Sequence, residues 1–354
     1  DEWKFDLFVK EGWETMLGLI ESAVISIDCE QFILDNDTIG NRFMELFESK
    51  ARQGVRVRLL CDAAGSYNLL NSSRPAALSA SGVQILFFNI INPWRINNYA
   101  SWFFRNHKKM LIVDGTTATT GGVSIRDSMH AWRDSLVTIR NRAVGQMTRA
   151  FDSMWDASLR KKRDAFKNFP VVEENFSFLV NAPLPRQRFL YRRIIRKLRQ
   201  AKRYIYLTTP YFVPDPRGLR VLRLAARRGI DVRLLIPRAS DHPFVDRASA
   251  SYFHLLLDSG VRIFRYSKGM MHTKTIVVDD EWATIGSLNY DNLSFLLNYE
   301  GNLTAASPKF AGELRDHFIK DLESALEVRF EDWSRRPLRE KTVELLTWPL
   351  HGFL

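Results

Sequence analysis

The stretches NHKKMLIVDGTTATTGG (106–122) and MHTKTIVVDDEWATIGS (271–287) follow one pattern. In each, His and Lys stand two residues apart, a largely apolar run of four residues follows the Lys, and Asp and a later Gly come after it. A short apolar run rich in β-branched residues is typical of a buried strand. Residues two apart on a strand face the same side, so the His and Lys of each copy are predicted to point into one space.

The similarity extends outward from this motif over both halves of the chain. The matched pairs are VISIDCEQFILDND (24–37) with RYIYLTTPYFVPD (203–215), ARQGVRVRLLCD (51–62) with ARRGIDVRLLIP (226–237), and SGVQILFFN (81–89) with SGVRIFRYS (259–267). Each unit has the order strand, helix, Gly turn, strand, which indicates βαβ units. We therefore predict an α/β fold with two similar domains packed as a pseudo-twofold pair. Their sheets are expected to be mixed but largely parallel, with helices on their faces.

The domain limits follow from the same comparison. The first repeat is assigned to residues 1–160 and the second to residues 176–332. Between them, KKRDAFKNFPVVEEN (161–175) is charged and contains Pro, as expected of a linker. Residues 333–354 form a basic amphipathic tail.

Composition restricts the class of partner. With 45% hydrophobic and 26% charged residues, the 354-residue chain has the composition of a folded globular protein. Its net charge of +11 favours an anionic partner, which can be nucleic acid, an acidic membrane or a phosphate-bearing substrate.

No apolar run is long enough to span a membrane. The chain begins at Asp1 rather than Met, which is compatible with an upstream anchor. Cys29 and Cys61 are interpreted as two buried thiols rather than a disulfide.

The paired motif predicts chemistry at phosphorus. The candidate catalytic residues are His107, Lys109 and Asp114 in the first copy and His272, Lys274 and Asp279 in the second. Burying two His/Lys pairs for packing alone is expensive, which favours a catalytic role over a structural one. One imidazole can attack a phosphodiester while the other protonates the leaving alkoxide, and the lysines neutralise the phosphoryl oxygens. This scheme requires no metal and no cofactor. The two Asp residues, each at the end of a strand, look more structural than chemical.

An attacking imidazole needs a carboxylate to hold its other nitrogen. Asp134 lies 27 residues after His107, and Glu300 lies 28 after His272. This near-equal spacing predicts that each half supplies its own orienting carboxylate. Ser124 and Asn289, at equal offsets from the two motifs, are candidate phosphate-binding residues.

These residues resemble the phospholipase D superfamily of HKD enzymes over nearly the whole chain, and bacterial cardiolipin synthases most closely. The resemblance is carried by TPYFVPD (209–215), SDHP (240–243), GMMHTKTIVVDDEWATIGSLNYDNLSF (269–295), LNYEGNL (297–303) and WSRRPLREKTVELLTWPL (333–350). It implies phosphatidyl transfer to phosphatidylglycerol at the bacterial cytoplasmic membrane, with His107 as nucleophile and His272 as acid and base. Ser124 stands where the family usually has Asn, and Leu293 where Arg is common.

Three segments bear on the partner. PRQRFLYRRIIRKLRQAKRY (185–204) has nine basic residues and an apolar face, which suits either a membrane surface or the protein core. The tail suits an interfacial anchor or docking against the body. The insert INPWRINNYASWFF (91–104) is interpreted as an aromatic lip for acyl chains rather than a packed loop.

Three alternative functions remain open. The first is a hydrolytic phospholipase D, in which water resolves the phosphohistidine. The second is a phospholipase D-like nuclease, which is disfavoured because no nucleic-acid module is recognisable. The third is an inactive membrane scaffold, which two intact His/Lys pairs disfavour. We therefore expect a peripheral or anchored membrane protein that acts on an anionic phospholipid, with nucleic acid an unlikely partner.

Overall fold

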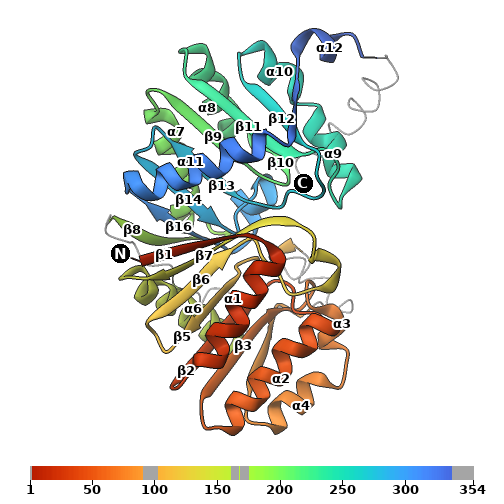
Figure 1. Cartoon of the computed structure of the whole chain (residues 1–354), viewed down its shortest axis with the longest axis vertical. Helices are drawn as coiled ribbons and strands as arrows, with labels where there is room; N and C mark the ends of the chain where they lie inside the picture. The colour runs from red at the N-terminus through yellow and green to blue at the C-terminus, as the bar shows by residue number, and fades with distance from the viewer. Residues whose placement is uncertain (1, 91–102, 161–166, 168–174, 337–354) are drawn as a thin grey trace.

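The computed structural model describes residues 2–90, 103–160, 167 and 175–336. Most of the predicted linker, the residues 91–102 of the aromatic insert and the residues 337–354 of the tail lie outside this part. The two halves of the chain form two lobes, one above the other in Figure 1.

The first half is built on a seven-stranded sheet of order β1-β7-β6-β5-β2-β3-β4. Its strands are β1 (Glu2–Phe8), β2 (Ser26–Gln31), β3 (Arg56–Asp62), β4 (Gln84–Phe88), β5 (Met110–Val113), β6 (Thr117–Gly121) and β7 (Arg133–Arg140). Its helices are α1 (Val9–Ser22), α2 (Thr38–Arg52), α3 (Tyr67–Leu70), α4 (Arg74–Ala80) and α6 (Ala143–Leu159), with a short 3₁₀ turn at Asp127–Met129.

The second half has an eight-stranded sheet of order β17-β12-β11-β9-β13-β14-β16-β8. Its strands are β8 (Phe176–Asn181), β9 (Tyr204–Thr208), β11 (Asp231–Pro237), β12 (Arg262–Tyr266), β13 (Thr275–Val278), β14 (Trp282–Gly286), β16 (Glu300–Ala305) and β17 (Ala325–Val328), and a separate pair joins β10 (Phe212–Val213) to β15 (Tyr290–Asp291). Its helices are α7 (Phe189–Gln200), α8 (Pro216–Arg227), α9 (Pro243–Ala250), α10 (Phe253–Asp258), α11 (Pro308–Leu322) and α12 (Phe330–Ser334), with short turns at Pro185–Gln187 and Leu293–Leu297.

The internal duplication is visible in how corresponding helices begin and end. Asp37 and Asp215, at matching positions, cap α2 and α8 by accepting the amides of the residues three further on. The turns that follow these helices contain Gly54 and Gly229, whose φ angles of 88° and 85° suit glycine. Local sequence therefore determines the matching βαβ units.

The prediction of largely parallel sheets is wrong, although both sheets are mixed. Among the described residues of the two main sheets, the parallel pairs are β2–β3, β3–β4, β9–β11 and β11–β12. The remaining pairs are antiparallel. The strand after each His/Lys pair, β5 or β13, is joined to the next strand, β6 or β14, by a short turn. Short turns of this kind join antiparallel strands.

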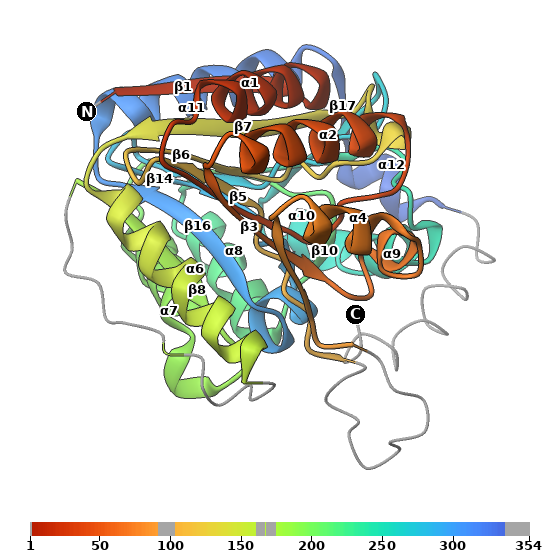
Figure 2. The same cartoon turned by 90° about the horizontal axis from the view of Figure 1, so that it is seen from below.

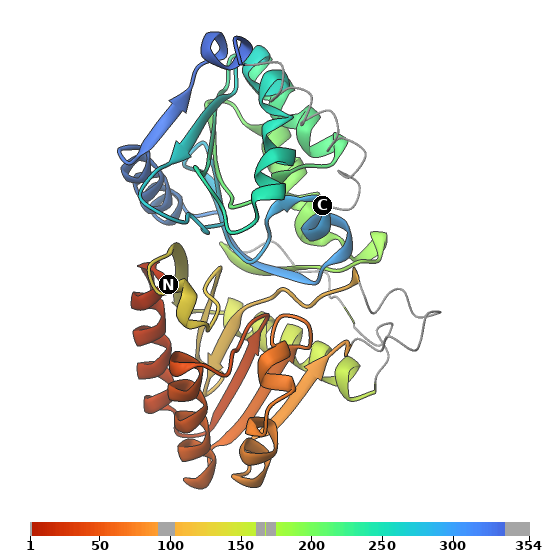
Figure 3. The ribbon, with the colours of Figure 1, turned by 90° about the vertical axis from the view of Figure 1, so that its right-hand side faces the viewer.

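Helices cover both faces of each sheet (Figures 2 and 3). Helices α1 and α2 share one core with the outer face of the first sheet, and α7 and α8 share another with the second. A third core joins the halves, because it contains residues of both sheets together with α6 and α11. The two motifs therefore belong to lobes that pack through a continuous apolar layer.

Two sequence interpretations are resolved by this packing. The apolar face of the basic segment is buried in the core as part of α7, through Leu190, Ile194 and Leu198, while Arg192 and Arg196 are exposed. Both cysteines are buried free thiols, as expected. Within the described residues, no helix combines the length and the hydropathy needed to cross a membrane.

Candidate active site between the two halves

The backbone of each His-containing segment is hydrogen-bonded to the other half of the molecule. The amide of His107 donates to the carbonyl of Tyr299 over 2.9 Å, and the amide of His272 donates to the carbonyl of Arg133 over 2.8 Å. These bonds accompany two isolated parallel β-bridges that relate the halves symmetrically. Both motifs therefore lie at the interface between the halves.

Each imidazole is paired with the carboxylate that directly follows its bridge. Nδ1 of His107 lies 3.0 Å from Oε2 of Glu300, and Nδ1 of His272 lies 2.6 Å from Oδ2 of Asp134. The prediction that each half orients its own histidine is wrong, because the partners are exchanged. The cause is topological: Glu300 and Asp134 each come one residue after the residue that pairs with the opposite motif.

These contacts determine which ring nitrogen is available for reaction. A carboxylate only accepts hydrogen bonds, so Nδ1 of each ring carries the proton and Nε2 keeps a lone pair. Burial lowers the pKa of His107. Burial and the ammonium of Lys274 lower the pKa of His272 to about 4, although Asp134 opposes this change. Both rings are therefore neutral near pH 7, with Nε2 able to act as nucleophile or base.

The two lysines lie beside the imidazoles and affect each other. Nζ of Lys109 donates to the carbonyl of His107 over 2.9 Å, and Nζ of Lys274 donates to that of His272 over 2.6 Å. Nζ of Lys274 is also 3.0 Å from Nε2 of His272. Burial and the charge of Lys274 lower the pKa of Lys109 to about 7, and burial lowers that of Lys274 to about 8. A bound anion would relieve this repulsion and restore both charges.

Aromatic rings enclose the two imidazoles. Phe32 meets His107 edge-on with ring centroids 4.8 Å apart. Trp132 and Tyr211 lie near His272, with centroid separations of 5.1 Å and 6.2 Å. Such apolar walls limit the access of water and account for the dominant effect of burial on the histidine pKa values. Electrostatic effects are correspondingly strong in this site.

The motif aspartates, which the prediction counted with the catalytic groups, do not reach the imidazoles. The carboxylate of Asp114 accepts the backbone amides of residues 24–26, and that of Asp279 accepts those of residues 202–204. Five positions along a strand separate each Asp from its motif lysine, which is about 16 Å at ~3.3 Å per residue. Their role is to hold the start of the neighbouring strand, and their place in the catalytic set is corrected.

Ser124 and Asn289 are both buried. The carbonyl of Ser124 accepts a hydrogen bond from the indole of Trp13 over 2.8 Å. The side chain of Asn289 is bonded to Asp291, and its Oδ1 has no partner among the described residues. Their role in binding phosphate stays a prediction.

One difference between the halves was missed in the sequence. Oγ of Ser287 donates to Oε2 of Glu300 over 2.5 Å. At the matching position, Gly122 lies so close to Asp134 that an added Cβ would be 2.2 Å from its carboxylate. Both residues directly follow the matching glycines of the motif, so the aligned halves contained the signal. Among the described residues, Glu300 therefore has a hydroxyl donor and Asp134 has none.

The chemical capacity of the site rests on six side chains: His107, Lys109, Asp134, His272, Lys274 and Glu300. The site holds two neutral imidazoles and two amines, and a bound anion would favour the charged form of both amines. This combination suits group transfer at a phosphodiester. In the described part of the chain, no group of three or more His, Cys, Asp or Glu is placed to hold a metal ion.

Comparisons with known proteins identify the family that this chain resembles. The family model described as "Cardiolipin synthase, PLD-like domain" matches residues 16–155 and 194–322. The chain is 34% identical over 348 residues to a cardiolipin synthase of Geobacillus kaustophilus, covering 95% of this chain and 69% of that protein. It is 35% identical over 335 residues to a cardiolipin synthase A of Pseudomonas putida, covering 91% and 69%.

Solved structures extend the comparison to the fold. A phosphatidylserine synthase of Haemophilus influenzae matches with a TM-score of 0.78 at 14% identity, covering 98% of this chain and 93% of that one. A polyphosphate kinase of Porphyromonas gingivalis matches with a TM-score of 0.65 at 13% identity, covering 100% and 54%. Together with the family model of a PLD-like domain, which matches both halves of the chain, these similarities confirm the predicted pair of phospholipase D-like α/β domains.

Proposed function

The chain belongs to the cardiolipin synthase family of phospholipase D-like proteins, and we propose that it transfers a phosphatidyl group to phosphatidylglycerol to form cardiolipin. Family membership makes the protein a phosphatidyltransferase. The donor and acceptor lipids and the role of each side chain belong to the proposal.

The first step is attack on the donor lipid. Nε2 of His107 forms a bond to phosphorus, and the bond from phosphorus to the head-group oxygen breaks. The alkoxide takes its proton from Nε2 of His272, whose ring enters this step in the protonated form that Asp134 and the negative charge of the bound phosphate stabilise. Glu300 holds Nδ1 of His107 and stabilises the positive charge that develops on its ring. Lys109 and Lys274 neutralise the nonbridging phosphoryl oxygens.

The second step resolves the phosphohistidine. A glycerol hydroxyl of phosphatidylglycerol gives its proton to Nε2 of His272 and bonds to phosphorus, while the bond to His107 breaks. Asp134 keeps His272 in the tautomer that accepts this proton. With water in place of the glycerol hydroxyl, the same step would yield phosphatidic acid.

The observation that carries this proposal is the exchanged pairing of histidines and carboxylates across the interface. Two imidazoles, each oriented by a buried carboxylate and each beside a lysine, form the set that a two-step transfer through a covalent intermediate requires. The order of roles, with His107 as nucleophile, rests on the resemblance of the motifs.

We also propose that the protein works at the surface of the bacterial cytoplasmic membrane. Its net charge of +11 favours approach to anionic lipid. Exposed arginines on α7, including Arg192 and Arg196, contribute to this charge. Its lipid substrates are themselves located in such a membrane.

The test is incubation with phosphatidylglycerol vesicles, with and without a chelator, followed by lipid analysis. We expect cardiolipin and free glycerol in equal amounts, with no effect of the chelator. The variants His107→Ala and His272→Ala should lose this activity, whereas His130→Ala, which changes an exposed histidine, should retain it. If phosphatidic acid is the main product, the reaction is hydrolysis rather than transfer. Turnover of DNA without turnover of lipid would contradict the proposal.

A further inference from the structure

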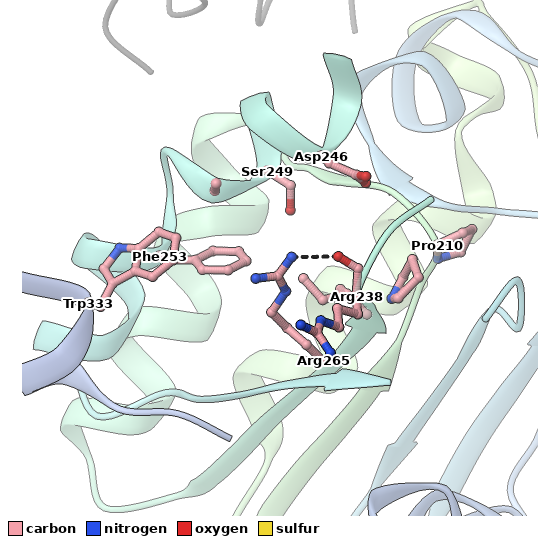
Figure 4. A pocket seen from close by; sticks show the side chains of 10 residues that line it. Pro210, Arg238, Asp246, Ser249, Phe253, Arg265 and Trp333 are labelled. Atoms are coloured by element: carbon pink, nitrogen blue, oxygen red, sulfur yellow. Dashed lines mark hydrogen bonds between the residues drawn. The ribbon is translucent and has the colours of Figure 1, made fainter. Parts of the chain in front are cut away.

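A second cavity, separate from the histidine site, lies in the second half at the carboxyl ends of β9, β11 and β12. Its lining includes Pro210, Arg238, Ser249, Arg265 and Trp333 (Figure 4). Open α/β sheets commonly bind ligands at this edge of their parallel strands. The cavity volume of about 40 Å³ is roughly three times the ~10–15 Å³ needed for one water. A group of several heavy atoms therefore fits.

The cavity has more positive than negative charge. Arg265 donates from Nη2 to the backbone carbonyl of Arg238, so the two arginines lie side by side (Figure 4). In the described part of the chain, the guanidinium of Arg238 has no hydrogen bond or ion pair. The one carboxylate of the lining, Asp246, already accepts the amide of Ser240 over 2.9 Å. The lining therefore has two guanidinium groups and one carboxylate, and that carboxylate already accepts a hydrogen bond.

A buried hydroxyl completes the polar lining. Ser249 is 5% exposed, and its Oγ has no hydrogen-bond partner among the described residues. Figure 4 shows this oxygen directed into the cavity, toward the guanidinium of Arg265. A buried polar group without a partner is unfavourable in the folded state and is uncommon. A ligand that accepts a hydrogen bond would satisfy it.

The opposite wall is apolar. The rings of Phe253 and Trp333 lie against each other with centroids 4.9 Å apart. Burial and the charge of Arg238 lower the pKa of Arg265, and Asp246 opposes this change. An anion between the two guanidinium groups would offset both unfavourable effects. Guanidinium groups and hydroxyls are donors, and together they match the tetrahedral oxygens of a phosphate.

We propose that this cavity is a phosphate-binding site distinct from the histidine site. The phosphate belongs either to the head group of an anionic lipid or to free inorganic phosphate, since both present the same oxygens. Pro210 lines the cavity, and the next residue, Tyr211, lies beside His272, so the two sites are neighbours. Phosphate binding in this cavity does not depend on which lipid is transferred.

The test is titration of the whole protein with inorganic phosphate by calorimetry. We expect two sites in the wild type. Arg265→Gln and Arg238→Gln should each lose the cavity site, or weaken it about tenfold or more, and keep the other. The double variant Lys109→Gln/Lys274→Gln should lose the histidine site and keep the cavity site. Circular dichroism and thermal melting verify that each variant is folded.

Ser249→Ala separates binding from a structural role. Removal of an unpaired hydroxyl leaves the fold intact or slightly more stable, so weaker phosphate binding in this variant would support the proposal. Unchanged binding in Ser249→Ala and in both arginine variants would overturn it. A single wild-type site that disappears only in the double lysine variant would also overturn it.

The two sources of phosphate are distinguished in a His107→Ala background, which prevents turnover. Short-chain phosphatidylglycerol below its micellar concentration is added as a competitor of inorganic phosphate. Displacement of phosphate from the cavity site would identify a lipid head group as the ligand. Phosphate binding without such displacement would identify free phosphate.

Discussion

Nδ1 of His107 is bonded to Oε2 of Glu300, which lies 193 residues further along the chain, and His272 is bonded in the same way to Asp134, 138 residues before it. Each half therefore holds a histidine whose orienting carboxylate belongs to the other half. Neither half alone contains both members of either histidine–carboxylate pair. The interface that joins the lobes is thus part of the site, which gives a functional reason for the continuous core between them.

The exchanged pairing predicts which histidine each carboxylate controls. Asp134→Asn should change the titration of His272, and Glu300→Gln should change that of His107, because each substitution removes the negative charge beside Nδ1 of the other half's histidine. Loss of such a carboxylate lowers kcat by about 10⁴-fold in the serine-protease triad, and we expect a loss of ~10²–10⁴-fold here. Nitrogen NMR of labelled histidines measures the titrations.

Quenched-flow trapping supplies a kinetic readout for the same pair of variants. With His107 as nucleophile, Glu300→Gln should slow the formation of phosphohistidine. If Asp134→Asn altered the ring of His107 and left that of His272 unchanged, the exchanged pairing would be refuted.

The asymmetry between Ser287 and Gly122 predicts unequal tolerance to substitution. Gly122→Ala should reduce activity strongly, because the added Cβ would be 2.2 Å from the carboxylate of Asp134 and would displace it. Ser287→Gly copies the first half and should leave the geometry intact. It removes one hydrogen bond to a buried carboxylate, with an expected loss of about 1.5–3 kcal/mol in stability. Steady-state kinetics and chemical denaturation of both variants measure these effects. Equal activity of the two variants would contradict this account.

The lowered pKa of Lys109 predicts proton uptake on binding an anion. At pH 8, the amine with a pKa of about 7 is mostly neutral in the free protein, and an anionic phosphodiester raises this pKa. Calorimetric titration with a phosphodiester analogue, in buffers of different ionisation enthalpy, should show net uptake at pH 8 and less uptake at pH 6. Lys109→Gln should reduce this uptake, while Lys4→Gln, which changes an exposed lysine, should not.

The same shift has a consequence for stability. The folded pKa of Lys109 lies below its unfolded value of roughly 10.4, so the unfolded chain binds more protons between these limits. The contribution of Lys109 to the free energy of unfolding should therefore become more favourable as the pH rises from about 7 to about 10. Denaturation of wild type and Lys109→Met at several pH values isolates this contribution. If this contribution became less favourable between pH 7 and pH 10, the lowered pKa of the buried Lys109 amine would be excluded.

A structural role for Asp114 predicts loss of stability without loss of chemistry. Asp114→Ala removes the acceptor of three backbone amides and should lower the free energy of unfolding by about 1–3 kcal/mol at pH 7. Activity per folded molecule should remain close to that of the wild type. Burial opposes ionisation of this carboxyl, but the backbone amides lower its pKa overall. Its stabilising effect should therefore disappear as the pH falls below about 4. A large loss of kcat at full stability would return Asp114 to the catalytic set.

Much of the fold follows from local sequence. The caps Asp37 and Asp215 and the turn glycines Gly54 and Gly229 are readable as helix and turn signals, and they recur at matched positions. Strand direction was predicted less well. The strands after each motif are as apolar as parallel strands, so their composition does not show their direction, which the short connections to the next strand make antiparallel.

The sequence by itself determined that the chain is duplicated. It also predicted that the two His/Lys pairs serve one site and that Asp134 and Glu300 are the orienting carboxylates. Only the tertiary structure decided which carboxylate serves which histidine. The near-equal spacing from histidine to carboxylate in the two halves is compatible with pairing inside a half or across the interface. The reason is that spacing along the chain does not specify how the two lobes are placed relative to each other. The backbone bridges from His107 to Tyr299 and from His272 to Arg133 select the second arrangement.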